Sequence, residues 1–164
     1  MSYIIDTDLL SFLRRKGRSR KLERFVVAHE SEIFVSVVTW AEIEHGIALT
    51  EEVFQKDLRP WAAAVREQFA GATLPLDEAV LVRWKQLLAE LKARNRTVAC
   101  EDSLIAATAL HFNCTILTSN TAHFAPTGAS VSNPMEQGFS SNRMIGYLPA
   151  WMESGTRVST DELA

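Results

Sequence analysis

The sequence lacks the features of a secreted or membrane-spanning protein. It contains two cysteines, Cys100 and Cys114, which lie far apart and form no C-x-x-C pattern. We therefore predict two buried, reduced thiols rather than a disulfide or a zinc site. No apolar run approaches the roughly 20 residues of a membrane span, and the start, MSYIIDTD, does not have the pattern of a signal peptide. We expect a cytoplasmic protein without a membrane segment.

Several common functional motifs are also missing. The sequence contains no G-x-x-x-x-G-K-[ST], no G-x-G-x-x-G and no G-x-S-x-G, which argues against the usual nucleotide-binding and serine-hydrolase sites. The four histidines show no ligand spacing such as H-E-x-x-H, which argues against zinc. The net charge of −3 provides no overall positive field, so any binding of nucleic acid must depend on local basic patches.

What the sequence does contain is an alternation of strand and helix patterns. Short apolar runs predict strands at 3–5, 33–37 and 115–119, with shorter candidates at 72–76 and 128–133. Helical spacing predicts helices that start near Thr7 and cover 19–29, 40–48, 51–70, 77–94 and 102–112. This alternation predicts an α/β fold in which helices cover both faces of a mostly parallel central sheet.

The chain is long enough for one domain with a core of its own, since 47% of its 164 residues are hydrophobic. Pro60 marks a break or a kink in the helical pattern of 51–70. After residue 136 neither the helix period nor the strand period continues. We therefore predict a domain over 1–136 and an irregular C-terminal tail over 137–164.

Acidic and amide side chains follow the predicted strands. Asp6 and Asp8 come after the first strand, Glu42 follows the second, and Asp102 opens the helix before the strand that leads to Asn120. The carboxyl ends of parallel strands gather at one edge of a sheet, so these side chains should converge there. Crowded carboxylates repel one another unless a cation bridges them, and oxygen ligands suit Mg²⁺ or Mn²⁺.

Most of these residues also have a purely structural interpretation. Thr39-x-x-Glu42 fits a capping box, and Asp102 can cap the helix that it opens. Thr7 or Asp8 can cap the first helix, and Asn120 suits a turn. Capping does not explain Asp6, which ends an apolar strand beside a second acid and would be costly to bury unpaired.

One segment, RRKGRSRKLER at 14–24, has seven Arg or Lys residues in eleven positions. A solvated helical surface explains such a run as well as phosphate binding does. Its position one helix after Asp6 favours contact with a phosphate backbone.

Taken together, these segments resemble a PIN-domain ribonuclease, specifically a VapC-type toxin of the FitB-like branch. IIDTDLLSFLRR is similar to the first strand and acid of that family, and VSVVTWAEIEHGI resembles its Ser-x-x-Thr-x-Ala-Glu-x-x-x-Gly segment. EDSLIAATALHFNCTILTSNTAHF resembles the Asp-x-x-Ile-Ala-Ala-x-Ala helix and the following Thr-x-Asn strand end. VSNPM is similar to the Asn-Pro-aromatic ending, with Met135 in the aromatic position. The resemblance covers residues 2–136.

The resemblance implies a three-layer α/β/α sandwich with four or five strands and an endoribonuclease that depends on Mg²⁺ or Mn²⁺. The catalytic and metal-binding residues that it implies are Asp6, Glu42 and Asp102. Supporting residues would be Asn120, Asp8 and Thr118, and the candidate RNA contacts are Arg14, Arg15, Lys16 and Arg18. His123 departs from the family, where many members carry an Asp, which puts a second metal position in doubt because imidazole is a poorer Mg²⁺ ligand than carboxylate.

The resemblance also implies partners: an RNA substrate, a second copy of the chain in a homodimer, and a cognate antitoxin lying in the acidic groove. Two alternatives stay open. One is a PIN fold that binds RNA or a partner without cleaving RNA. The other is a haloacid-dehalogenase-like phosphatase, although its D-x-D-x-[TV] motif would need Thr or Val where this chain has Leu10.

Overall fold

A five-stranded parallel sheet organises the protein. The structure, a computed structural model, describes residues 1–15, 19–136 and 152. The strands lie in the order β3-β2-β1-β4-β5, and every neighbouring pair is parallel. Their bounds are β1 Tyr3–Ile5, β2 Ile33–Ser36, β3 Thr73–Leu74, β4 Thr115–Leu117 and β5 Val131–Ser132. The five predicted strand positions and the parallel arrangement are confirmed.

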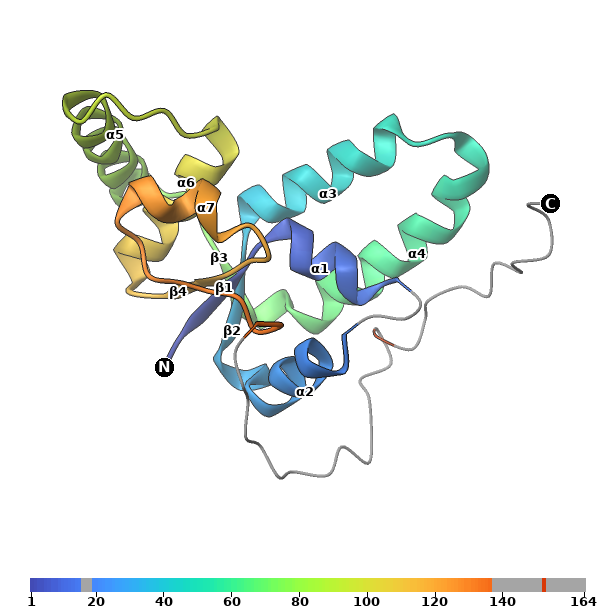
Figure 1. Ribbon diagram of the computed structural model, residues 1–164. Coiled ribbons are helices and arrows are strands. Elements are labelled where there is room, and N and C mark those ends of the chain that lie inside the picture. The colour runs from blue at the N-terminus through green and yellow to red at the C-terminus, as the bar shows by residue number, and fades with distance from the viewer. Residues whose placement is uncertain (16–18, 137–151, 153–164) are drawn as a thin grey trace.

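Helices connect the strands and cover the sheet (Figure 1). In the described part of the chain they are α1 Thr7–Leu13, α2 Arg20–Ala28, α3 Val37–Leu49, α4 Glu52–Gln68, α5 Glu78–Ala93, α6 Cys100–Phe112 and α7 Thr121–Phe124. Short 3₁₀ turns occur at Glu30–Glu32, Ala70–Ala72 and Ala125–Thr127. Helix α7 was not predicted from the sequence. Pro60 does not break its helix, because α4 continues through it.

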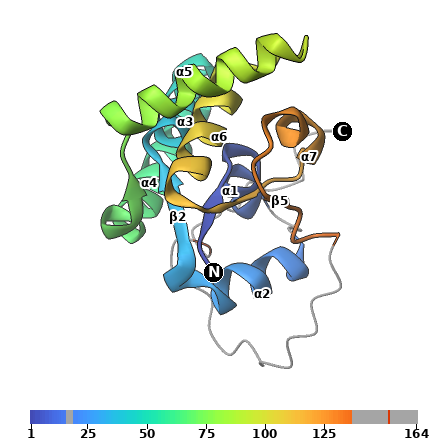
Figure 2. The same cartoon turned by 90° about the vertical axis from the view of Figure 1, so that its left-hand side faces the viewer.

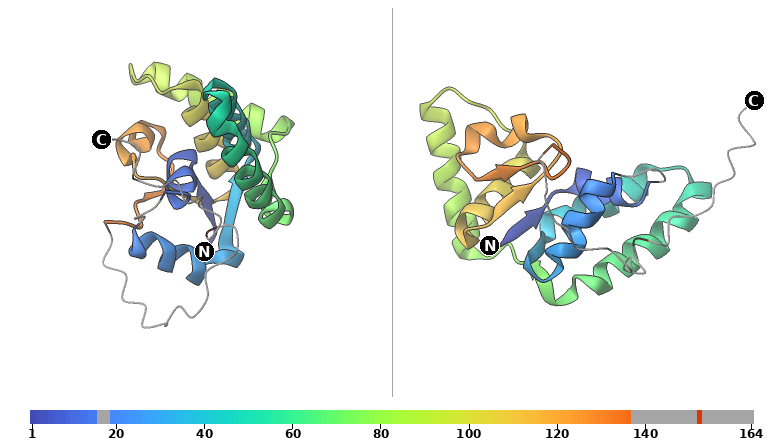
Figure 3. Two further views of the ribbon diagram at one scale, coloured as in Figure 1. Left: turned by 90° about the vertical axis from the view of Figure 1, so that its right-hand side faces the viewer. Right: turned by 60° about the horizontal axis from the view of Figure 1, so that its bottom comes forward.

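The alternation of side chains along β1 separates two hydrophobic cores. Tyr3 and Ile5 pack with residues of α1, α2 and α4, whereas Ile4 packs with residues of α5 and α6. Ile4 and Ile5 are fully buried, as expected for a central strand covered on both faces. Figures 2 and 3 show α5 and α6 on one side of the strands and α2 on the other. The predicted three-layer α/β/α sandwich is confirmed.

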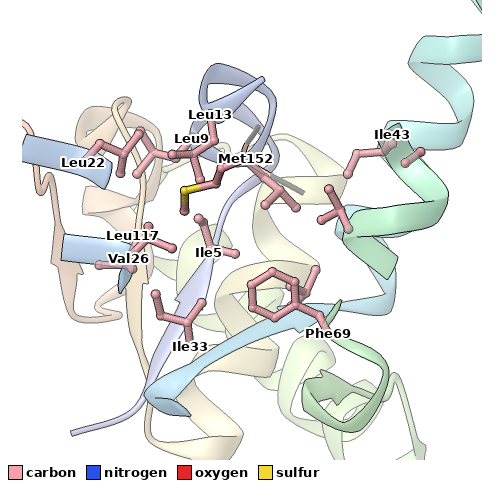
Figure 4. Packing of buried hydrophobic residues seen from close by; sticks show 14 of the residues in the cluster. Ile5, Leu9, Leu13, Leu22, Val26, Ile33, Ile43, Phe69, Leu117 and Met152 are labelled. Carbon is pink, nitrogen blue, oxygen red and sulfur yellow. The ribbon is translucent and has the colours of Figure 1, made fainter. Parts of the chain in front are cut away.

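One residue of the segment predicted as a tail belongs to the core. Met152 is 1% exposed and is part of the cluster on the α1–α2 side, where Figure 4 shows it beside Leu9 and Ile5. The other residues of 137–164 lie outside the described part of the chain, so the predicted tail and domain boundary stay predictions. The core itself extends beyond residue 136.

The two thiols differ from the sequence prediction in one respect. Both are free, as predicted, and Cys114 is buried, but Cys100 is exposed. Cys100 is the first residue of α6, and this helix end reaches the surface at the edge where the parallel strands end. The prediction that both thiols are buried was therefore wrong for Cys100.

The core position of Met152 leads to a stability prediction. We expect Met152→Ala to lower the free energy of unfolding by about 2–5 kcal/mol, the range for removing a large buried side chain. Urea unfolding of the full chain measures this value. Leu49→Ala is the control, because Leu49 is 75% exposed and its loss should change stability by less than about 0.5 kcal/mol. Equal midpoints for Met152→Ala and wild type would mean that this side chain does not stabilise the core.

Candidate active site

The carboxyl ends of the three central strands meet at one edge of the sheet. Ile5 pairs with Val35 of β2 on one side and with Leu117 of β4 on the other. The next level of the sheet therefore holds Asp6 after β1, Thr118 after β4 and Ser36, the last residue of β2. The Asp6 N–H continues the ladder by donating to the Leu117 carbonyl at 2.9 Å. Helices α1 and α3 begin at this edge (Figure 1). The sheet register thus creates the polar edge that the sequence predicted.

Asp6 is a buried acid held in a fixed position. It is 7% exposed, its Oδ1 accepts from the Thr7 N–H at 2.8 Å, and its Oδ2 accepts from the Thr118 hydroxyl at 2.9 Å. Burial, and then the charges of Asp8 and Glu42, raise its pKa to about 7, although the hydrogen bonds from Thr118 and Thr7 lower it. The ionised form of Asp6 is therefore disfavoured, and a positive charge nearby would stabilise it.

Asp8 connects α1 to the loop after β4. Its Oδ2 accepts from the Ser119 N–H at 2.9 Å, from the Ser119 hydroxyl and from the Thr118 hydroxyl at 3.3 Å. Its other oxygen accepts from the Leu9 N–H at 2.5 Å. Asp8 is thus a neighbour of Asp6 that fixes the geometry of this edge. Ser119 is a site residue that the sequence analysis missed, because nothing local distinguishes it from an ordinary loop serine.

Glu42 reaches the same edge from α3. The Thr7 hydroxyl donates to its Oε2 at 2.5 Å, which connects the first turn of α1 to the middle of α3. Partial burial raises the pKa of Glu42, the charges of Asp102, Glu101 and Asp8 raise it further, and the Thr7 hydrogen bond lowers it. These couplings place Glu42 between the acids of α1 and those of α6.

Asp102 projects from the first turn of α6 and contacts a histidine. Burial raises its pKa, His123 lowers it, and Glu101 and Asp8 raise it again. His123 Nδ1 lies 3.3 Å from Asp102 Oδ2, and the Asn120 amide nitrogen lies 2.9 Å from His123 Nε2. If the amide donates to Nε2, the neutral imidazole carries its proton on Nδ1 and donates it to Asp102. His123 therefore acts here as a hydrogen-bond partner of Asp102.

The structure also tests the capping interpretations. Ser36, and not Thr39, is the N-cap of α3, so the capping-box interpretation of Glu42 was wrong. The Thr39 hydroxyl is buried without a hydrogen-bond partner among the described residues. The N-cap of α6 is Ala99, so Asp102 is not its N-cap. Asp6 itself caps α1, so the expectation that Thr7 or Asp8 caps this helix was wrong, as was the expectation that capping does not explain Asp6.

Four predicted acids thus meet at one edge: Asp6, Asp8, Glu42 and Asp102. Their mutual effects on pKa show that they act on each other electrostatically, and exposed Glu101 adds a fifth charge. Glu101 was not among the site residues predicted from the sequence. Its position next to Asp102 in the first turn of α6 was the available signal.

The donor set fits a hard cation. Among residues 1–15, 19–136 and 152, no three His, Cys, Asp or Glu side chains are gathered closely enough to hold a metal jointly. Mg²⁺ does not require such a cage, because it keeps several waters and commonly uses one or two carboxylates. Several carboxylates with raised pKa values, and oxygen donors throughout, therefore fit Mg²⁺ or Mn²⁺ better than zinc.

The candidate RNA contacts are only partly described. Arg14 lies over the Trp61 ring, 5.8 Å from its centroid, and Arg15 lies over Phe12 at 6.0 Å. Lys16 and Arg18 lie outside the described residues. No helix in the described part of the chain is both long and apolar enough to cross a membrane.

Comparisons with known proteins identify relatives of the chain. The chain is similar to Toxin FitB of Neisseria gonorrhoeae, at 29% identity over 137 residues that cover 80% of this chain and 96% of that protein. It is also similar to VapC ribonuclease Y4jK of Sinorhizobium fredii, at 27% identity over 139 residues that cover 81% and 97%.

Solved structures show the same fold. The crystal structure of FitAcB from Neisseria gonorrhoeae matches with a TM-score of 0.76 and 26% identity, over 82% of this chain and 99% of that one. VapBC2 of Rickettsia felis, bound to a DNA fragment, matches with a TM-score of 0.72 over 81% and 98%, and at 17% identity it supports the fold alone. The family profile of the PIN domain matches residues 3–128, and the chain belongs to the PIN-domain family.

Proposed function

We propose that this protein is a Mg²⁺- or Mn²⁺-dependent endoribonuclease that acts as the toxin of a toxin–antitoxin pair in the cytoplasm. The observation that carries the proposal is the convergence of Asp6, Glu42 and Asp102, each with a raised pKa, at the carboxyl edge of a parallel sheet. The similarity to a protein named Toxin FitB and to one named VapC ribonuclease supports both the activity and the toxin role.

Each acid has a role that follows from its contacts. Asp6 and Asp102 would hold the cation most directly, and Glu42 would orient a water. When bound, the cation supplies a Lewis acid beside the scissile phosphate and lowers the pKa of the attacking water. Thr118 and the Thr7 N–H fix the Asp6 carboxylate, while His123 fixes that of Asp102. Arg14 and Arg15 would attract the phosphate backbone.

The proposed partners follow from the relatives. Solved neighbours include FitAB bound to a DNA fragment, at 25% identity, and FitAcB. We therefore propose a cognate antitoxin that lies across the acidic edge, a homodimer of this chain and an RNA substrate. A hydrolase acting through an aspartyl ester fits less well, because β4 is followed by Thr118, Ser119 and Asn120 rather than by paired acids.

Cleavage of RNA tests the activity. Purified protein should degrade tRNA with Mg²⁺ and leave it intact with EDTA. Asp102→Asn should lower the rate by roughly 100-fold or more, since it removes a charge at the reacting phosphate. Glu44→Gln is the matched control: this exposed acid of α3 lies 3.9 Å from Arg66 on the helix surface and should keep the wild-type rate. Equal, metal-independent rates for all three proteins would favour the non-catalytic alternative.

The raised pKa of Asp6 leads to a test of stability against pH. The pKa of Asp6 is about 7 in the folded state, against an ordinary value of 3.8. Its protonation therefore stabilises the metal-free fold fully at a pH below 3.8, and this contribution is lost as the pH rises through about 7. The Asn side chain of Asp6→Asn stays neutral at every pH. With EDTA at about pH 8, the free energy of unfolding of this variant should therefore be higher than that of wild type by on the order of a few kcal/mol.

Urea unfolding in EDTA across this pH range measures the effect, with exposed Asp57→Asn as the control. Adding Mg²⁺ should stabilise wild type and not Asp6→Asn, because binding to the folded state raises stability. An Asp6→Asn protein that is less stable than wild type at every pH would show that burial of the ionised Asp6 carboxylate does not destabilise the fold.

The toxin role has a separate test in cells. Induced expression should arrest bacterial growth, because uncontrolled RNA cleavage stops protein synthesis. Asp102→Asn should relieve the arrest at an equal protein level, measured by immunoblot, whereas Glu44→Gln should not. Normal growth with an active wild-type enzyme would indicate a housekeeping nuclease.

A further inference from the structure

A small groove opens beside the acidic edge and is not needed to hold the cation. Helices α1, α3 and α4 enclose it, and its volume is about 200 Å³. Thr7 and Glu42, which meet at the acidic edge, also line the groove. Any group bound there therefore lies directly beside the proposed reaction centre.

The groove has one cationic wall and an apolar wall. Arg14 and Arg15, which directly follow α1, line one wall, and Ile43, Ile47 and Leu58 line the other from α3 and α4. The Arg14 guanidinium carbon lies 5.8 Å from the centroid of the Trp61 ring, within cation–π range, and Trp61 is only 4% exposed. Ser11 adds a hydroxyl to the same lining. The combination offers a flat cationic surface, an apolar contact and hydrogen-bonding groups.

Gly46 keeps one side of the groove open. It lies one helical turn after Glu42 on the same face of α3, and it lines the groove. A Cβ built at this position would meet no atom within 4 Å. A side chain at residue 46 would therefore start in open space beside the groove without displacing core atoms.

We propose that this groove binds one unpaired base of the RNA next to the scissile phosphate. The proposal rests on the ribonuclease function proposed above and names a recognition site for its substrate. A cavity of about 200 Å³ is smaller than the usual 300–1,000 Å³ of small-molecule pockets, which suits a single flat ring. Proteins read single-stranded RNA by stacking splayed bases on aromatic or Arg planes and by hydrogen bonds to base edges.

The charges favour a base over other occupants. A second phosphate or an acidic side chain would be attracted by Arg14 and Arg15 but repelled by Glu42 on the same lining. A cationic side chain would meet the two arginines. A neutral ring with donors and acceptors on its edges meets neither penalty, and its face can stack on the Arg14 guanidinium.

Binding of RNA in EDTA tests the proposal without any cleavage. The probes are fluorescent single-stranded oligonucleotides of adenine, cytosine, guanine or uracil, and a ribose-phosphate oligomer without bases. Wild type should bind at least one base-bearing probe roughly tenfold tighter than the abasic oligomer, the effect of one stacked base. Gly46→Phe should remove this preference while leaving affinity for the abasic oligomer unchanged, and Gly46→Leu should do the same if the larger ring prevents folding.

Gly71→Phe is the matched control. Gly71 lies in the 3₁₀ turn before β3, a Cβ there also meets no atom within 4 Å, and it does not line the groove. This variant should bind all probes as wild type does, and its thermal unfolding curve shows what an added exposed ring costs. A Gly46→Phe protein that binds every probe like wild type would overturn the proposal, as would one that loses affinity for the abasic oligomer equally.

A protein partner is the competing occupant. Gly46→Phe that keeps the base preference but no longer retains a co-expressed antitoxin would assign the groove to that partner and overturn the base site. The outcomes also separate the two proposals. Base-dependent binding without any cleavage would contradict the nuclease alone, whereas metal-dependent cleavage with an unaffected Gly46→Phe variant would contradict the groove alone.

Discussion

The parallel pairing of β1 on both sides is the constraint on which the active edge depends. Ile5 sits opposite Val35 and Leu117, so the chain must leave all three strands at the same level of the sheet. Asp6 and Thr118 are adjacent for this reason, although 112 positions separate them in the sequence. A slip of one residue in either pairing would turn the alternating side chains to the wrong face. The buried β-branched residues of β1 and β2 therefore set the geometry of the acids as well as the core.

The same edge is costly to the folded chain. Asp6, Glu42 and Asp102 all have raised pKa values, mainly because of burial, which means that the fold opposes their ionisation. The protein offsets part of this cost with hydrogen-bonding groups, namely the Thr7 hydroxyl, the Thr118 hydroxyl and the His123 ring. In the described part of the chain, no Lys or Arg side chain forms an ion pair with these three acids. A cation from solution would stabilise these buried carboxylates in place of a cationic side chain.

Much of this arrangement was predictable from sequence, because the relevant signals are local. Apolar runs followed by helical spacing predicted the strands, their mostly parallel arrangement and the position of Asp6 at a strand end. The errors arose where tertiary structure decides. Thr39 has the spacing of a capping box but lies inside α3, because the chain enters that helix directly from β2 at Ser36. The pairing of Ser119 with Asp8 spans 111 positions, and Met152 reaches the core from beyond the family match at 3–128. No local pattern encodes these contacts.

The groove and the acidic edge share Thr7 and Glu42, so the proposed base site and the proposed antitoxin position would overlap. A base held between α1 and α3 would fix the neighbouring phosphate close to the acids, because only one backbone step separates a base from its own phosphate. A partner segment that lies across the edge from α1 to α3 would cover Glu42, and would then necessarily close the mouth of the groove as well. Such a segment blocks the cation and the base at once. An antitoxin would therefore need only a short length of chain at this position to prevent both binding and cleavage.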